Sequence, residues 1–281
     1  MAKKPTAPKA TALERLLAEG FFPNREAALP YLMSGAVFCG QEKVFTGGQR
    51  VPLHLPLSVR GLHDRYVGKG GHKLEGAIRD FGIAVAGRVC IDAGACTGGF
   101  TDCLVQHGAA QVYAVEVGFG QLAGSLQQNP KVTNLEKTNL GDKSLLLLAP
   151  APTLGSVDLS YLSLVKAVPQ FRAIMHSCGE LICLVKPLFE IDSAESRRTG
   201  EIAPEEYAPL LARMANELSA QEDTLVCGLT HSHITGNHGT HEFFLHVRFL
   251  GGAPKSGVPK NWLPEAEEAV QRVLTLPRYE K

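Results

Sequence analysis

The stretch Asp92-Ala-Gly94-Ala-Cys96-Thr97-Gly98-Gly99-Phe100 follows an apolar segment and opens a helical pattern that runs to His107. Glycines at such a place allow the backbone to turn sharply from strand to helix and allow a ligand to approach it closely. Gly94 and Gly98 are four residues apart and Gly99 follows directly, so the spacing differs from that of the dinucleotide-binding fingerprint. We therefore interpret residues 92–100 as a ligand-binding turn of an α/β sheet.

Strand and helix patterns alternate around this turn. Apolar segments predict seven strands, at Arg88–Ala93, Gln111–Val117, Val132–Glu136, Ser156–Leu159, Glu180–Lys186, Thr224–Leu229 and Glu242–Phe249. Helical spacing predicts helices at His72–Phe81, Phe100–His107, Gln121–Gln128, Leu164–Met175, Glu205–Ala220 and, at the periphery, Pro264–Leu276. Helical crossovers favour an α/β fold with a doubly wound, Rossmann-like parallel sheet. The last two strands have no helix between them, so one is expected to be an antiparallel edge strand.

The first quarter of the chain has a different character. Short amphipathic pieces between Thr11 and Pro56 predict two helices and a hairpin region, which is a small α+β domain. Residues 1–73 hold 11 Lys and Arg against 5 Asp and Glu, whereas residues 74–281 hold 17 against 23. A basic module of this kind suits a polyanionic partner. The predicted organisation is a flexible basic arm over 1–10, a small domain over 11–59, a linker over 60–70, the α/β domain over 71–252 and an extension with one helix over 253–281.

Composition excludes several classes of protein. The 281 residues are 44% hydrophobic and 20% charged, as in a soluble globular protein. No apolar run approaches the roughly 18 residues of a membrane-spanning helix, and the N-terminus leads into no apolar signal segment. The seven cysteines include no Cys-x-x-Cys pair, which argues against a thiolate zinc site and a disulfide framework. These features predict a cytoplasmic protein without a membrane partner.

Two acidic residues stand at the ends of the first two predicted strands. Glu116 ends the second strand, where a carboxylate can accept hydrogen bonds from ribose hydroxyls. Asp92 opens the glycine turn and suits a ligand ammonium or an ordered water. S-adenosylmethionine fits both residues because it has an amino group and a ribose diol but no pyrophosphate. There are two alternatives to an S-adenosylmethionine site. One is a turn with a purely structural role next to a surface glutamate, and the other is a nicotinamide-dependent oxidoreductase, which the glycine spacing disfavours.

Four longer stretches carry a family pattern: Arg65–Leu74, Asp92–Asp102, Tyr113–Leu122 and Asp158–Leu164. They resemble the TlyA (haemolysin-A-like) family of ribosomal RNA methyltransferases, whose catalytic domain is of the FtsJ type. The resemblance implies S-adenosylmethionine-dependent methylation of a ribose 2′-hydroxyl, at cytidine, with ribosomal RNA and ribosomal subunits as partners. Residues 11–52 resemble a small RNA-binding module shared with a ribosomal small-subunit protein and some pseudouridine synthases. The residues expected to bind the cofactor are Asp92, Gly94, Thr97, Gly98, Gly99, Phe100, Glu116 and Asp158.

Methyl transfer to a ribose hydroxyl requires an aligned acceptor oxygen and loss of its proton, because the sulfonium methyl is already activated. FtsJ-type enzymes are similar in using a Lys-Asp-Lys-Glu set, and the resemblance implies that this set is Lys73, Asp158, Lys186 and Glu242. Lys186 is expected to contact the 2′-hydroxyl, while the two carboxylates orient the lysines. Asp158 and Lys186 end predicted strands, which places both in the crevice at the carboxyl edge of the sheet. Each of the four, taken singly, could instead be a solvated cap or an edge residue.

The remaining candidates concern RNA and metal. The cations expected to meet RNA phosphates are Arg15, Arg25, Lys43 and Arg50. Five histidines lie between His231 and His246, but their spacing matches no common zinc pattern, so no metal is expected. Two further functions stay open as alternatives: a membrane-active cytolysin, which the family's older name suggests, and a non-catalytic RNA-binding protein.

Overall fold

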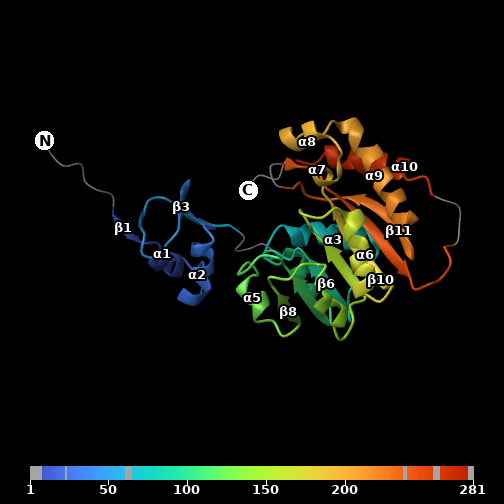
Figure 1. Cartoon of the computed structure of the whole chain (residues 1–281). Coiled ribbons are helices and arrows are strands. Elements are labelled where there is room, and N and C mark those ends of the chain that lie inside the picture. Colours follow the sequence, from blue (N-terminus) through green and yellow to red (C-terminus); the bar gives the residue numbers. More distant parts are fainter. Residues whose placement is uncertain (1–7, 23, 61–64, 237–238, 256–259, 278–281) are drawn as a thin grey trace. The chain divides into compact units, whose positions relative to one another are not determined.

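The structure is a computed structural model that describes residues 8–22, 24–60, 65–236, 239–255 and 260–277. Contacts divide the chain into two compact units, Met1–Arg65 and Tyr66–Lys281 (Figure 1). The boundary lies inside the predicted linker. Tyr66 is only 2% exposed and packs in the core of the second unit, so residues 66–70 belong to that unit.

The first unit is a small α+β domain. Its elements are β1 (Lys9–Thr11), α1 (Ala12–Ala18), α2 (Arg25–Met33), β2 (Val37–Cys39), β3 (Glu42–Val44), β4 (Arg50–Pro52) and β5 (Leu57–Val59). Strands β3, β2 and β5 form one sheet, and β1 pairs with β4. Thr11 and Glu14 form a capping box that starts α1. Leu16, Leu32 and Val37 are fully buried and hold the helices against the strands.

The second unit contains a seven-stranded sheet in the order β11-β12-β10-β9-β6-β7-β8. The strands are β6 (Val89–Ala93), β7 (Gln111–Val115), β8 (Val132–Leu135), β9 (Leu154–Val157), β10 (Cys178–Val185), β11 (Thr224–His231) and β12 (Phe243–Leu250). Neighbouring strands from β8 to β10 are parallel, whereas β12 is antiparallel to both β10 and β11. The predicted α/β fold with antiparallel pairing at one edge is confirmed. The antiparallel strand β12 is inserted between β10 and the outermost strand, β11.

Helices cover both faces of this sheet. They are α3 (Gly70–Phe81), α4 (Gly99–Gln106), α5 (Gly124–Gln127), α6 (Leu164–Ile174), α7 (Pro187–Glu190), α8 (Ala194–Thr199), α9 (Pro204–Ala220) and α10 (Leu263–Leu274), with a 3-10 helix at Lys143–Leu147. One core cluster joins α3 and α4 to the sheet through Leu74 and Leu104. The largest cluster joins α6, α9 and α10 through Phe171, Leu211 and Val273. Both faces of the sheet are therefore buried, as expected for parallel strands.

Two sequence predictions about helices differ from the structure. Helix α10 is not peripheral, because it packs against α9 and β11 and contributes Ala266 and Val273 to the largest core cluster, together with Trp262 at its N-cap. The helix predicted over Gln121–Gln128 shortens to Gly124–Gln127, since the preceding residues form a loop beside the glycine turn.

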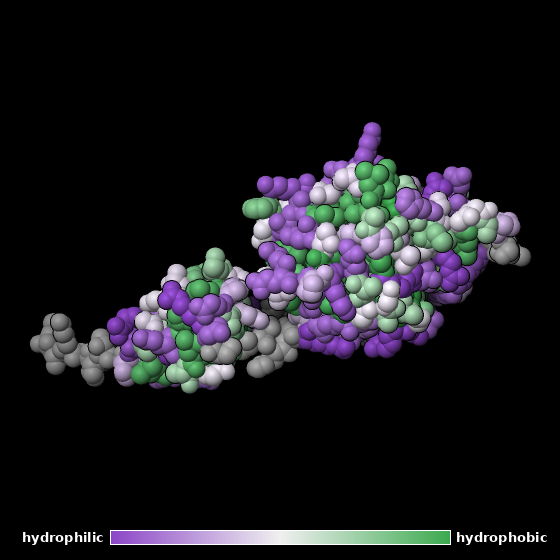
Figure 2. All heavy atoms as spheres, turned by 90° about the horizontal axis from the view of Figure 1, so that it is seen from below, coloured by the Kyte–Doolittle hydropathy of each residue, from purple (hydrophilic) through white to green (hydrophobic). Residues whose placement is uncertain are grey.

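Polar and apolar side chains are interspersed on the face of the molecule that Figure 2 shows. The exposed apolar residues include Met33 and Phe45 in the first unit and Phe119 and Leu147 in the second. Within the described residues, no helix has the length and apolar character needed to cross a membrane.

Candidate functional site

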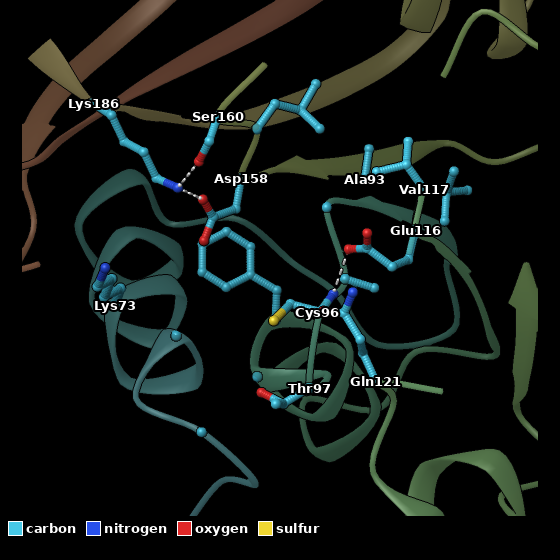
Figure 3. A pocket seen from close by; sticks show the side chains of 18 of the residues that line it. Lys73, Ala93, Cys96, Thr97, Glu116, Val117, Gln121, Asp158, Ser160 and Lys186 are labelled. Atoms are coloured by element: carbon cyan, nitrogen blue, oxygen red, sulfur yellow. Dashed lines mark hydrogen bonds and ion pairs between the residues drawn. The ribbon is translucent and has the colours of Figure 1, made fainter. Parts of the chain in front are cut away.

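A cavity of about 440 Å³ opens at the carboxyl ends of the parallel strands (Figure 3). After β6 it is lined by residues 94–97, Gly99 and Phe100. Glu116 and Val117 line it after β7, residues 158–161 after β9, and Lys186 after β10. Ligands of doubly wound sheets bind in this crevice because the strand-to-helix loops diverge there.

Two positions of the turn require glycine, because there is no space for a Cβ atom there and the backbone is left-handed. Gly94 has φ +84°, and a Cβ at this position would collide with the carbonyl oxygen of Asp158. Gly98 has φ +98°, and a Cβ there would collide with Leu126 of α5. Both angles lie in the left-handed region that favours glycine. The turn can therefore pack tightly against its neighbours and still direct its backbone toward the cavity.

Glu116 is half-buried at the cavity wall, directly after β7. Its carboxylate accepts a hydrogen bond from the backbone N–H of Cys96 at 3.0 Å and another from Gly118 at 2.7 Å. These bonds fix the direction of the side chain, which Figure 3 shows beside the Cys96 backbone. Each carboxylate oxygen can accept more than one hydrogen bond, so capacity remains for ligand hydroxyls.

Asp92 does not line the cavity, and the predicted contact between its carboxylate and a ligand is wrong. The residue is fully buried beneath the turn and accepts hydrogen bonds from Thr101 at 2.7 Å and Ser156 at 2.8 Å. Burial, which disfavours the charged carboxylate, raises the pKa of Asp92 to about 6. Asp92 therefore supports the turn from below by linking β6 to α4 and β9.

Two lysine–carboxylate pairs face the cavity. The ammonium of Lys186, after β10, forms an ion pair with Asp158 and donates a hydrogen bond of 3.0 Å to Ser160 Oγ. Lys73 of α3 forms an ion pair with Glu242, just before β12, and both side chains are almost completely buried. The four residues come from four separate elements, and the fold brings all of them to one cavity.

Most of the predicted cofactor residues line this cavity, namely Gly94, Thr97, Gly99, Phe100, Glu116 and Asp158. Gly98 does not line it, because its place is fixed by packing against α5. The prediction missed other lining residues, including Gly68, Lys69, Gln121, Thr138, Ser160 and Tyr161. A signal was present for all of these except Thr138, since the other five lie within the family stretches Arg65–Leu74, Tyr113–Leu122 and Asp158–Leu164.

A second cavity, of about 810 Å³, lies beside the first and shares Ser160, Lys186 and Glu242 with it. The rest of its wall comes from short helix α7, the end of α8 with the loop after it, the start of α9, the loop before β12 and Leu274 of α10. Aromatic side chains of Phe189 and Tyr207 line it, and Phe189 is 52% exposed. The amine of Lys186 therefore stands at the boundary between two cavities.

The four cations predicted to meet RNA divide into two groups. Arg15 is only 6% exposed, donates to the carbonyls of Pro52 and Leu55 at 2.7 and 3.0 Å, and pairs with Glu19. Its predicted role as a phosphate contact is wrong, because its guanidinium holds the first unit together. The side chains of Arg25, Lys43 and Arg50 are exposed.

The histidine-rich segment is partly a hydrogen-bonding network. His233 contacts Asp80 of α3 at 2.8 Å and Arg79 at 3.1 Å, and Thr230 donates to the same Asp80 carboxylate. His231 lies close enough that Asp80, His231 and His233 form a group which could hold a metal ion. Burial and the neighbouring His233 lower the pKa of His231. His238 lies outside the described residues.

Known proteins and structures match most of the chain. A family model described as FtsJ-like methyltransferase matches residues 66–249. The Bacillus subtilis protein YqxC, named for an rRNA methyltransferase, is 37% identical over 269 residues, which covers 95% of this chain and 93% of that protein. The Mycobacterium tuberculosis 16S/23S rRNA (cytidine-2′-O)-methyltransferase TlyA is 38% identical over 187 residues, covering 65% and 68%.

Relatives named for hemolysins also match. Hemolysin A of Brachyspira hyodysenteriae is 31% identical over 239 residues, which covers 83% of this chain and 97% of that protein. A solved structure from Streptococcus thermophilus, named for a hemolysin, has a TM-score of 0.69 at 31% identity and covers 96% of this chain and 97% of its own.

Proposed function

Because the chain belongs to the FtsJ-like methyltransferase family, we propose that it methylates the ribose 2′-hydroxyl of a cytidine in ribosomal RNA, with S-adenosylmethionine as methyl donor. The observation that carries this proposal is the placement of two lysine–carboxylate pairs around a cavity that also presents Glu116. The name of the TlyA relative, which specifies cytidine in 16S and 23S rRNA, supports this choice of acceptor.

The cavity residues fit the cofactor. When bound, S-adenosylmethionine supplies a methyl group that its sulfonium has already activated. Glu116 would accept hydrogen bonds from the ribose hydroxyls, because its carboxylate is held in place by two backbone N–H groups and keeps free acceptor capacity. The backbone from Gly94 to Thr97 would contact the ligand, since these residues line the cavity and the missing side chain of Gly94 lets the turn pack closely against Asp158.

Lys186 is the residue that would contact the acceptor hydroxyl. Its amine lies at the boundary of the two cavities, so a hydroxyl that approaches from the second cavity reaches the amine and the cofactor cavity together. A neutral amine can take the hydroxyl proton, and Asp158 would then stabilise the resulting ammonium. Lys73 and Glu242 would act as a buried, oriented pair that shapes the wall behind the acceptor.

The second cavity would receive the acceptor nucleotide. Its exposed aromatic side chain Phe189 offers an apolar face for a nucleobase, as single-stranded RNA recognition commonly requires. A base can reach such a cavity only if it leaves the RNA stack.

The first unit would add electrostatic affinity through Arg25, Lys43 and Arg50, which are exposed and can meet phosphates. Because ribosomal RNA is the proposed substrate, we infer that the protein acts on ribosomes in the cytoplasm.

The test is a map of ribose methylation. Ribosomal RNA from cells with and without the protein is digested and examined by mass spectrometry, and a cytidine that is methylated only when the protein is present is the expected result. An identical map in both samples would refute the proposal. The names of the hemolysin relatives favour a membrane-active alternative, for which leakage of dye from liposomes, with an unchanged methylation map, would be the expected result.

A further inference from the structure

Ser160 lies within the family stretch Asp158–Leu164 but is not a member of the predicted catalytic set. It lies two residues after Asp158, in the loop that follows β9, and lines both cavities. Its hydroxyl oxygen accepts a hydrogen bond of 3.0 Å from the amine of Lys186. Figure 3 shows Asp158 and Ser160 converging on the Lys186 amine from the same loop.

The loop between these two side chains is anchored to the core. Leu159, the residue between them, is only 7% exposed and belongs to the largest hydrophobic cluster. The backbone N–H of Asp158 also donates to the carbonyl of Ala93 at 2.9 Å, which ties the loop to β6. Ser160 is therefore a fixed acceptor, although its own side chain faces the open cavity.

The hydrogen bond from Lys186 to Ser160 restricts the direction of the amine's lone pair, because the neutral amine has only two N–H groups. A neutral lysine amine has two N–H groups and one lone pair, whereas the ammonium has three N–H groups. With one N–H directed to Asp158 and the other to Ser160, the lone pair of the neutral amine has a single remaining direction. That direction is the one in which a proton acceptor can act.

We infer that Ser160 is a positioning residue, which fixes the rotation of the Lys186 amine so that its lone pair is directed at the acceptor hydroxyl. This inference rests on the proposed function. Asp158 alone cannot fix the lone pair, because with one N–H directed to Asp158 the lone pair can occupy either of the two remaining positions on the nitrogen. Loss of the second contact would thus reduce the fraction of complexes in which the amine can accept the proton.

The experiment compares Ser160→Ala and Ser160→Thr with the wild type in methyl transfer to ribosomal subunits that lack the modification. Ser163→Ala is the matched control, because Ser163 lies three residues on and caps α6 without a side-chain hydrogen bond. We expect Ser160→Ala to lower kcat roughly 10- to 100-fold, since a hydrogen bond to a charged or proton-accepting group is lost. KM for the subunits and the calorimetric affinity for S-adenosylmethionine should stay within about two-fold of wild type.

Two further readouts separate positioning from a structural role. Ser160→Thr keeps the hydroxyl and should restore most of the lost turnover, whereas damage to the loop would be made worse by the larger side chain. The pH at which Ser160→Ala reaches half of its maximal turnover should also move to lower pH, because an acceptor that favours the ammonium has been removed.

The outcomes are distinguishable. A kcat for Ser160→Ala within about two-fold of wild type, or a Ser160→Thr variant as slow as Ser160→Ala, would overturn the positioning role. A wild-type protein that transfers no methyl group while it binds S-adenosylmethionine would overturn the proposed function itself, and with it the role of Ser160.

Discussion

Replacement of Glu242 by glutamine should destabilise the second unit strongly. The substitution keeps the shape of the side chain but removes its charge, and it leaves the Lys73 ammonium without a counter-charge at a site where both side chains are about 95% buried. Breaking a buried ion pair by removing one partner costs about 3–5 kcal/mol of unfolding free energy, because a buried charge is left uncompensated. A loss of this size is a large part of the stability of a typical domain.

The assay uses the fluorescence of the single tryptophan during urea unfolding. Trp262 is only 2% exposed in the core of the second unit, so its signal reports on that unit and not on the first. The control is Asp158→Asn, which breaks the partly exposed pair with Lys186. The cost of breaking a solvent-screened pair is about 1 kcal/mol or less.

A second variant tests the cause of the loss. The double substitution Lys73→Met with Glu242→Gln removes both charges, and it should recover stability relative to Glu242→Gln alone, since no unpaired charge remains buried. If Glu242→Gln unfolds within about 1 kcal/mol of wild type, or if the double variant is less stable than the single one, the reasoning about the buried pair is refuted.

Four further predictions concern other residues. Glu116→Ala should weaken S-adenosylmethionine binding by about 1–3 kcal/mol in calorimetry, because ribose hydroxyls lose a charged acceptor, and unchanged affinity would remove Glu116 from the site. Lys186→Ala should abolish turnover and leave the affinity for the cofactor nearly intact. If the amine acts as a base, turnover of the wild type should rise with pH, whereas a flat profile to pH ~9 would leave the amine only an orienting role. Because the pKa of Asp92 is raised to about 6 in the folded protein, its protonated form favours folding. The stability it contributes should be full below its unfolded pKa of about 3.9 and lost as the pH rises through about 6. Wild type should therefore lose on the order of 3 kcal/mol relative to Asp92→Asn over that interval in urea unfolding, and parallel curves for the two proteins would contradict this. Arg15→Ala should destabilise the first unit, whereas Arg25→Ala should not. Of the two, only Arg25→Ala should flatten the salt dependence of RNA binding, by roughly 0.7–0.9 in log–log slope. The reverse pattern would restore Arg15 as a phosphate contact.

Local patterns in the sequence were enough to predict the fold class and the position of the site in the fold. The alternation of strands and helices is a short-range property, because each strand and helix must present an apolar face with its own period. The carboxyl end of a parallel strand is where ligands bind, so Glu116, Asp158 and Lys186 could be assigned to one crevice from their places in the chain. The structure brings these three together at the cavity.

Burial depends on contacts between distant segments, and only the tertiary structure decided it. Asp92 and Arg15 look like ligand contacts in the sequence, yet Asp92 lies beneath the glycine turn and Arg15 donates to carbonyls about 40 residues away. The pairing of Lys73 with Glu242, which are 169 residues apart, follows from the insertion of β12 between β10 and β11. Likewise, the packing of α10 into the core depends on its position against α9 and β11. The sequence alone determined which residues could bind or react, because their chemistry and local backbone are short-range properties. Which of them reach the cavity was decided by strand order and packing, because these bring distant segments into contact.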